Sequence, residues 1–238
     1  MDEATSGIAN KIKDYHPPEA AEKLVRETRL LLIAGPAGSG KDPIIKQLIA
    51  TGEYEYIISH TTRHPREGEE NAKDYYFVDL PTAESMVDER RFLEARVVYD
   101  SHLFGTSMAE IQRVHDSGKI GVTDIDVAGA DKYVKLGNNV KTIFVLPPSY
   151  DEWVHRLASR DSGEDADAIK RRLEDANRWL EQALKSGHFH FVINSDLDKA
   201  VAEVRELAEN PNYEKAQDET KVEHAWHVLG ELKRNLNT

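Results

Sequence analysis

A lysine follows a glycine-rich segment near the start of the chain, and its spacing is typical of a phosphate-binding loop. The segment reads Gly35-Pro36-Ala37-Gly38-Ser39-Gly40-Lys41, which has the form G-x-x-x-x-G-K. Glycines at this spacing let backbone N–H groups point toward a polyphosphate, while the N-terminus of the next helix faces the anion and Lys41 reaches the outer phosphates. The pattern therefore predicts a polyphosphate site.

The two residues after the lysine depart from the usual pattern. Asp42 stands where a Ser or Thr hydroxyl ordinarily helps to hold Mg²⁺, and Pro43 has no N–H to offer a phosphate. A glycine turn that only starts a helix is the alternative, because Asp and Pro are both common in a first helical turn. We favour phosphate binding, since a simple turn needs neither three glycines nor a lysine directed into it. Asp42 is the candidate metal ligand.

A second set of residues suited to anion binding lies in a polar loop. Arg63 and Arg66 are three apart and can hold one phosphate with their planar guanidinium groups. The hydroxyls of Ser59 and Tyr75 can complete the contacts to its oxygens. Surface arginines in a solvated loop are the alternative interpretation. Such a site would suit a monophosphate.

The elements that must position these residues alternate between strands and helices. Apolar runs predict strands at 30–34, 54–59, 74–78, 120–127, 140–146 and 189–194. Helical spacing and capping residues predict helices after the glycine loop and at 81–91, 107–117, 150–185 and 196–207, with a polar break at 162–164. This alternation predicts an α/β fold with a parallel sheet and helices on both faces.

Both ends of the chain differ from this pattern. Residues 1–28 are polar and contain one predicted helix that starts near Pro17-Pro18. After a boundary at Asn210-Pro211-Asn212, apolar residues at helical spacing predict a helix packed on the body or on a partner; they are Val222, Trp226, Leu229 and Leu236. His188 and His190 flank Phe189 and are predicted to face solvent rather than to hold a metal.

Composition limits the class of protein. The 238 residues contain no cysteine, which excludes disulfides, cysteine-ligated zinc and thiolate catalysis. The net charge of -12 argues against non-specific binding to nucleic acid or to an anionic membrane. The sequence has no run long enough to span a bilayer and no signal peptide, so we expect a cytoplasmic protein.

The segment SHTTRHPREGEENAKDYYFV at 59–78 resembles the signature of guanylate kinases, S-x-T-T-R-x-P-R-x-G-E-x-x-G-x-D-Y-x-F-V, with Ala72 in place of one glycine. The likeness continues through FLE at 92–94, FGT at 104–106, DIDVAG at 124–129, the arginines of 156–172 and INSDLDKA near the end. It implies a P-loop NTPase core at 29–209 between two helical extensions, 1–28 and 210–238. A GMP-binding lobe at about 61–110 and a lid at about 150–175 are implied within the core.

The resemblance implies a nucleoside monophosphate kinase that converts Mg-ATP and GMP, or dGMP, into ADP and GDP, or dGDP. The implied GMP-binding residues are Ser59, Arg63, Arg66, Tyr75, Glu94, Phe104, Thr106 and Asp124. ATP would contact the loop from Gly35 to Asp42 and Asn194, and the implied catalytic cations are Lys41, Arg156, Arg160 and Arg172. Glu94 would accept hydrogen bonds from guanine N1 and N2, which adenine cannot supply. Phe104 stands where many relatives have Tyr.

The sequence leaves two other interpretations of the function open. The chain could be a guanylate kinase-like module that binds GMP or a partner with weakened or no catalysis, as Asp42, Pro43 and Phe104 suggest. It could also be a related P-loop kinase that acts on another phosphorylated acceptor. We expect an enzyme that is slow because of Asp42-Pro43. Its expected partners are small nucleotides, and monomer and homodimer are both open.

Overall fold

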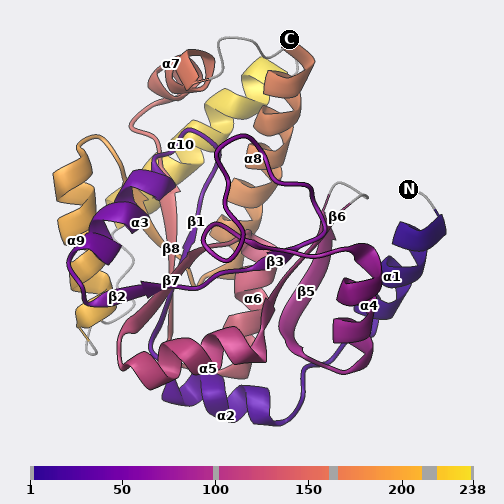
Figure 1. The fold of residues 1–238 in the computed structure, drawn as a ribbon. Coiled ribbons are helices and arrows are strands. Elements are labelled where there is room, and N and C mark those ends of the chain that lie inside the picture. The colour runs from indigo at the N-terminus through magenta and orange to yellow at the C-terminus, as the bar shows by residue number, and fades with distance from the viewer. Residues whose placement is uncertain (1–2, 99–101, 161–165, 211–218, 237–238) are drawn as a thin grey trace. The chain divides into compact units, whose positions relative to one another are not determined.

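The computed structural model describes residues 3–98, 102–160, 166–210 and 219–236, and it confirms the α/β fold (Figure 1). A five-stranded parallel sheet has the order β2-β7-β1-β8-β9. These strands are β1 Leu30–Ala34, β2 Tyr54–Tyr56, β7 Ile120–Asp124, β8 Val140–Leu146 and β9 His190–Ile193. The predicted strands at 30–34 and 140–146 are therefore confirmed at both ends.

The chain divides into two compact units. The first contains Met1–Leu30, Tyr54–Thr123 and Lys132–Val140, and the second contains Leu31–Glu53, Asp124–Asp131 and Lys141–Thr238. Each unit has a core of its own. In the first, buried apolar residues of α1 (Glu3–Lys13), α4 (Leu80–Asp88), β5 (Phe92–Val98) and β6 (His102–Ser107) form a cluster. In the second, those of α7 (Tyr150–Arg160), α8 (Ala166–Ser186) and α10 (Glu219–Leu236) form another.

The first unit holds a smaller sheet of order β4-β3-β6-β5. Its strands are β3 His60–Thr61, β4 Tyr76–Phe77, β5 Phe92–Val98 and β6 His102–Ser107. Two helices follow these strands, α4 Leu80–Asp88 and α5 Met108–Ser117, and each has a capped start: Asp79 accepts from the Thr82 N–H, and Ser107 accepts from that of Glu110. The strand predicted at 54–59 is wrong in one respect, because it ends at Tyr56 and pairing resumes in another sheet at His60.

The remaining helices match the predicted pattern except for α6, which was not predicted. They are α2 Ala20–Glu27, α3 Lys41–Ala50, α6 Val127–Leu136, α7 Tyr150–Arg160, α8 Ala166–Ser186, α9 Leu197–Glu209 and α10 Glu219–Leu236. The strand predicted to reach 127 ends at Asp124, because the Asp126 carboxylate instead accepts the Gly129 N–H (2.7 Å) at the start of α6. None of the described helices is long and apolar enough to cross a membrane.

Three expectations at the edges of the fold are wrong. Helix α1, Glu3–Lys13, precedes the one helix expected in the N-terminal segment. Helix α10 packs on α8 and buries Leu229 as expected, but Trp226 is 51% exposed, and Ala225, Val228 and Leu232 form the rest of the buried face. His190 is 9% exposed rather than on the solvent side, and His188 binds Asp131 (2.6 Å).

Candidate active site

The glycine loop between β1 and α3, in the second unit, has a backbone that only glycine can supply. Gly35, Gly38 and Gly40 all have positive φ angles, of 143°, 79° and 94°. A Cβ atom on Gly35 would lie 2.5 Å from the Val145 carbonyl oxygen, and one on Gly40 would lie 2.0 Å from Asn194 Nδ2. Conformation and close packing therefore both require the glycines of the motif.

Side chains hold the carbonyl groups of this loop. The bonds run from Lys41 Nζ to Gly35 O (2.7 Å) and Pro36 O (3.0 Å), from Trp153 Nε1 to Ala37 O (2.7 Å), and from Asn194 Nδ2 to Ser39 O (2.9 Å). A backbone whose carbonyl groups are held this way is prepared to offer its N–H groups to an anion. Trp153 was not among the predicted site residues, although it lies one turn before Arg156 on the same helix.

Two polar side chains of the loop are candidates to contact a metal ion or a phosphate. The Ser39 side chain is fully buried, and its hydroxyl has no hydrogen-bond partner among the described residues. Asp42 lies in the first turn of α3 directly after Lys41. No cluster of three or more His, Cys, Asp or Glu residues suited to a metal is found in the described part of the chain. One carboxylate still fits Mg²⁺, which takes most of its ligands from substrate phosphates and water at such sites.

The predicted lid arginines lie on α7 and α8, in the same unit as the loop. Arg156 Nη1 donates to the Asn194 carbonyl oxygen (3.2 Å), and its Nε donates to Glu152 (2.9 Å). Arg172 is half-buried on α8, while the neighbouring Arg171 is exposed. Arg160 is the last residue of α7, and its side chain lies outside the described ones. Asn194 thus links Arg156 to the glycine loop.

The first unit contains the arginine loop. Arg63 forms a two-pronged ion pair with Glu69, with N–O distances of 2.8 and 2.9 Å. Its guanidinium also lies over the rings of Tyr75 (5.4 Å) and Phe77 (5.8 Å). Glu69 raises the pKa of Arg63, and Arg63 lowers that of Glu69. These contacts fix the plane of the guanidinium, whose five donors allow it to bind a phosphate in addition.

Other predicted phosphate ligands surround this pair. The Arg66 backbone N–H donates to Glu69 (2.7 Å), and the Arg66 side chain is exposed. The Tyr75 ring packs edge-on against Phe104 at 5.8 Å. Glu69, which sequence reasoning missed, therefore holds both the Arg63 side chain and the Arg66 backbone.

A buried polar network surrounds the carboxylate predicted to read the base. Glu94 is 1% exposed and accepts from Thr106 Oγ1 (3.3 Å) and from Arg96 Nη1 (3.1 Å). Ser59 Oγ lies 3.4 Å from Thr106 Oγ1, so the network joins the predicted base site to the predicted phosphate site. Arg96 was missed, although its position two residues after Glu94 on a strand predicts the same face. Burial raises the pKa of the nearby Tyr133 hydroxyl, and the charge of Glu94 raises it further.

Glu110 is a second residue that sequence reasoning missed. It is 3% exposed in the first turn of α5. Its carboxylate accepts from the Ile58 N–H (2.8 Å) and the Tyr76 hydroxyl (3.2 Å), and Arg113 compensates its charge at 2.7 Å. Because Ile58 and Tyr76 adjoin Ser59 and Tyr75 in sequence, Glu110 holds the backbone that presents two predicted phosphate ligands.

The predicted guanine-binding set is divided between the units. Glu94, Phe104 and Thr106 belong to the first unit, whereas Asp124 ends β7 and belongs to the second. The structure thus gathers the predicted GMP residues of the first unit and, separately, the predicted ATP residues of the second.

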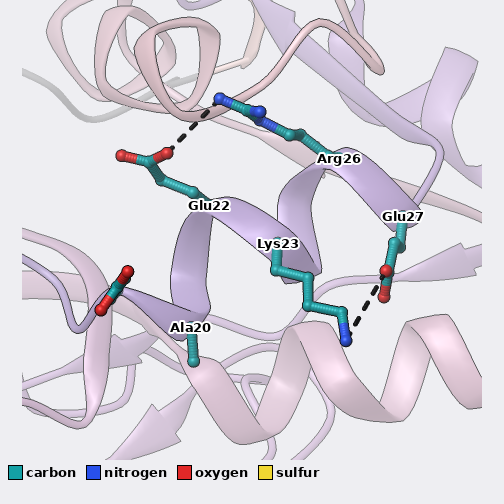
Figure 2. A pocket seen from close by; sticks show the side chains of 6 residues that line it. Ala20, Glu22, Lys23, Arg26 and Glu27 are labelled. Atoms are coloured by element: carbon teal, nitrogen blue, oxygen red, sulfur yellow. Dashed lines mark hydrogen bonds and ion pairs between the residues drawn. The ribbon is translucent and has the colours of Figure 1, made fainter.

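A pocket on α2 contains none of the predicted nucleotide-binding residues. Figure 2 shows the side chains that line it, which are Glu19, Ala20, Glu22, Lys23, Arg26 and Glu27. Arg26 pairs with Glu22 (3.4 Å) and Lys23 with Glu27 (3.9 Å), one turn apart on the helix. Such exposed pairs are typical of a solvated helix face and stabilise it weakly.

Comparisons with known proteins agree with the resemblance. The family model for guanylate kinase matches residues 27–211. A guanylate kinase of Sus scrofa is 35% identical over 181 residues, covering 75% of this chain and 90% of its own length. One of Legionella pneumophila (strain Lens) is 35% identical over 183 residues, covering 75% and 84%.

A solved structure also shares the fold. The crystal structure of guanylate kinase from Anaplasma phagocytophilum has a TM-score of 0.61 and 21% identity, and the match covers 84% of this chain and 96% of that one. With the sequence match spanning most of the chain, this protein belongs to the guanylate kinase family.

Proposed function

We propose that this protein transfers the γ-phosphoryl group of ATP to GMP or dGMP, giving ADP and GDP or dGDP. The observation that carries the proposal is membership of the guanylate kinase family over residues 27–211. The two sets of residues support it, because one suits a polyphosphate donor and the other suits a monophosphate acceptor with a purine base.

The predicted GMP-binding residues of the first unit would explain a preference for guanine. A buried carboxylate has to be satisfied by hydrogen-bond donors, and guanine presents two of them at N1 and N2. Glu94 already accepts from Thr106 and Arg96, and a carboxylate has acceptor sites for further donors. Adenine would bring an acceptor at N1 and leave Glu94 short of partners. The Arg63–Glu69 loop would hold the GMP phosphate.

The predicted ATP-binding residues of the second unit would hold ATP through backbone N–H groups and cationic side chains. On binding, we expect Lys41 Nζ to exchange the Gly35 and Pro36 carbonyls for phosphate oxygens. Bound Mg²⁺ would neutralise charge on those oxygens. Asp42 would hold it in place of the usual Ser or Thr hydroxyl, while adding a negative charge beside the phosphates. Arg156 and the other lid arginines would act as charge spreads over the moving phosphoryl group. Direct transfer needs no covalent intermediate on the protein.

Coupled release of ADP tests the proposal. With ATP and Mg²⁺, the rates with GMP and dGMP should exceed those with AMP, CMP and UMP. Glu94→Gln should lower kcat/KM for GMP by about ten- to one-hundredfold, because one charge-assisted acceptor is lost. The control Glu89→Gln changes an exposed carboxylate that pairs with Arg91 and should have no effect. Equal rates with AMP and GMP would refute the proposal.

A binding module without catalysis is the alternative that the sequence left open. Asp42, Pro43 and Phe104 suggested it, but the match to guanylate kinases over most of the chain does not favour it. ADP release combined with titration calorimetry excludes it or revives it: a module binds GMP in the calorimeter and releases no ADP at any Mg²⁺ concentration.

A further inference from the structure

The N-terminal segment lies outside the family match at 27–211, yet it packs on the strand that carries Glu94. Helix α1 contacts both α4 and β5, and Figure 1 shows it beside α4. Ile8 of α1 is fully buried in a cluster with Phe92 and Ala95. Ile12 and Tyr15 lie against the same cluster. The segment is therefore part of the core of the first unit.

Strand β5 is irregular at the point where this segment meets it. Phe92 pairs with Ser107 and Glu94 pairs with Thr106, so Leu93 is an additional residue and the strand has a bulge. The bulge changes the alternation of side chains. Phe92 and Ala95 are three apart yet share one apolar cluster, whereas Glu94 is directed to Thr106 and Arg96.

Tyr15 contacts the backbone of the bulge itself. Its hydroxyl donates a hydrogen bond to the carbonyl oxygen of Phe92. A bulge disrupts the regular pairing of the ladder, and a buried carbonyl left without a donor costs free energy. Burial raises the pKa of Tyr15 to about 12, which keeps the hydroxyl protonated as a donor at neutral pH.

We propose that Tyr15 is a positioning residue for Glu94: its hydroxyl holds the Phe92 carbonyl and so fixes the bulge that directs the Glu94 carboxylate toward the guanine base. The proposal rests on the proposed function, in which Glu94 reads guanine. Tyr15 touches no substrate and acts through the backbone of β5. The N-terminal segment thereby becomes part of the specificity of the enzyme.

Tyr15→Phe tests this, because it removes the hydroxyl and keeps the ring. We expect KM for GMP to rise about fivefold, the value of one lost hydrogen bond, with KM for ATP unchanged. The preference for GMP over IMP should fall as well, since IMP lacks the N2 amino group that Glu94 reads. A purely structural role would not change this preference.

Two control variants change the same segment without touching the hydroxyl. Ile8→Val trims the buried contact of α1 and should lower the melting temperature while leaving KM for GMP unchanged. Lys11→Ala removes the exposed ion pair with Asp88 (2.8 Å) and should change neither quantity. If Ile8→Val raises KM for GMP as much as Tyr15→Phe does, loss of stability explains both effects and the proposal is wrong.

The outcomes also separate this proposal from the proposed function. Wild-type protein that phosphorylates GMP, together with a Tyr15→Phe variant of unchanged KM and unchanged GMP-to-IMP preference, overturns the positioning role alone. Wild-type protein that does not distinguish GMP from AMP overturns the function, and the role of Tyr15 with it.

Discussion

His60 is a half-buried titratable residue within the predicted phosphate-binding segment. Its ring stacks on Tyr76 at 4.7 Å and meets Phe92 edge-on at 5.7 Å. Burial lowers its pKa from 6.5 to about 4, although the nearby Glu110 opposes the shift. The folded protein therefore keeps His60 neutral at pH values where the unfolded chain binds a proton.

The direction of the pH effect follows from this difference. The contribution of neutral His60 to the free energy of unfolding is complete above pH 6.5 and is lost as pH falls toward 4, because protons bind preferentially to the unfolded chain. At pH 5 we expect the free energy of unfolding to be lower by an amount on the order of 1–2 kcal/mol, with solvent screening included. Urea unfolding at pH 7, 6 and 5 should show a smaller loss in His60→Phe than in the wild type, whereas exposed His64→Gln should behave like the wild type. Equal pH slopes in all three proteins would contradict this.

Asp42 and Pro43 are the residues that we expect to slow turnover at the ATP site. Asp42 sets a negative charge beside the phosphates where Ser or Thr is neutral, and Pro43 removes one N–H donor from the loop. We therefore predict that the wild type has slow but measurable kinase activity. In the double variant Asp42→Ser, Pro43→Thr the activity should rise several-fold, which corresponds to the free energy of about one hydrogen bond. Steady-state rates should be measured across a Mg²⁺ titration, because a carboxylate ligand shifts the metal dependence as well as the rate.

The same double variant should leave KM for GMP unchanged, since both residues lie in the second unit. Activity that stays constant or falls would show that Asp42 is a functional part of the site rather than a defect.

At the scale of elements, the periodicity of apolar residues predicted those strands, turns and helices whose formation depends on neighbouring residues in the sequence. The β1 strand, the glycine turn and the start of α3 follow from five buried apolar positions and a motif of fixed spacing. Long-range contacts could not be predicted in this way. Trp153 and Asn194 hold loop carbonyls 116 and 155 residues away in sequence, and no local pattern specifies such a distance.

The bulge in β5 illustrates the same limit. Phe92, Leu93, Glu94 and Ala95 are all buried, so the sequence has no alternation of apolar and polar residues that could identify the face of each side chain, and no strand was predicted here. The register depends on which residue of β6 pairs with each of them. Sequence could indicate Glu94 as the base-reading residue only through resemblance. It missed Glu110 and Tyr15, whose partners Ile58, Tyr76 and Phe92 lie on other segments of the chain.

At the scale of the whole molecule, the C-terminal helix completes the core of the second unit. Leu232 of α10 is fully buried in a cluster with Trp153, Leu157 and Ala176, which lie on α7 and α8. Figure 1 shows α10 running beside α8. The helix that contacts the glycine loop therefore depends on a segment beyond the family match at 27–211.

Leu232→Ala should accordingly lower both the stability of the protein and its use of ATP. Truncating a buried leucine costs about 2–5 kcal/mol of unfolding free energy, because a cavity remains. Loosened packing of Trp153 should also raise KM for ATP more than KM for GMP. The control Trp226→Ala lies on the same helix at a side chain that is 51% exposed, and it should change stability by less than about 0.5 kcal/mol. Urea unfolding and steady-state kinetics measure both effects, and a Leu232→Ala protein as stable as Trp226→Ala would show that α10 contributes little to this core.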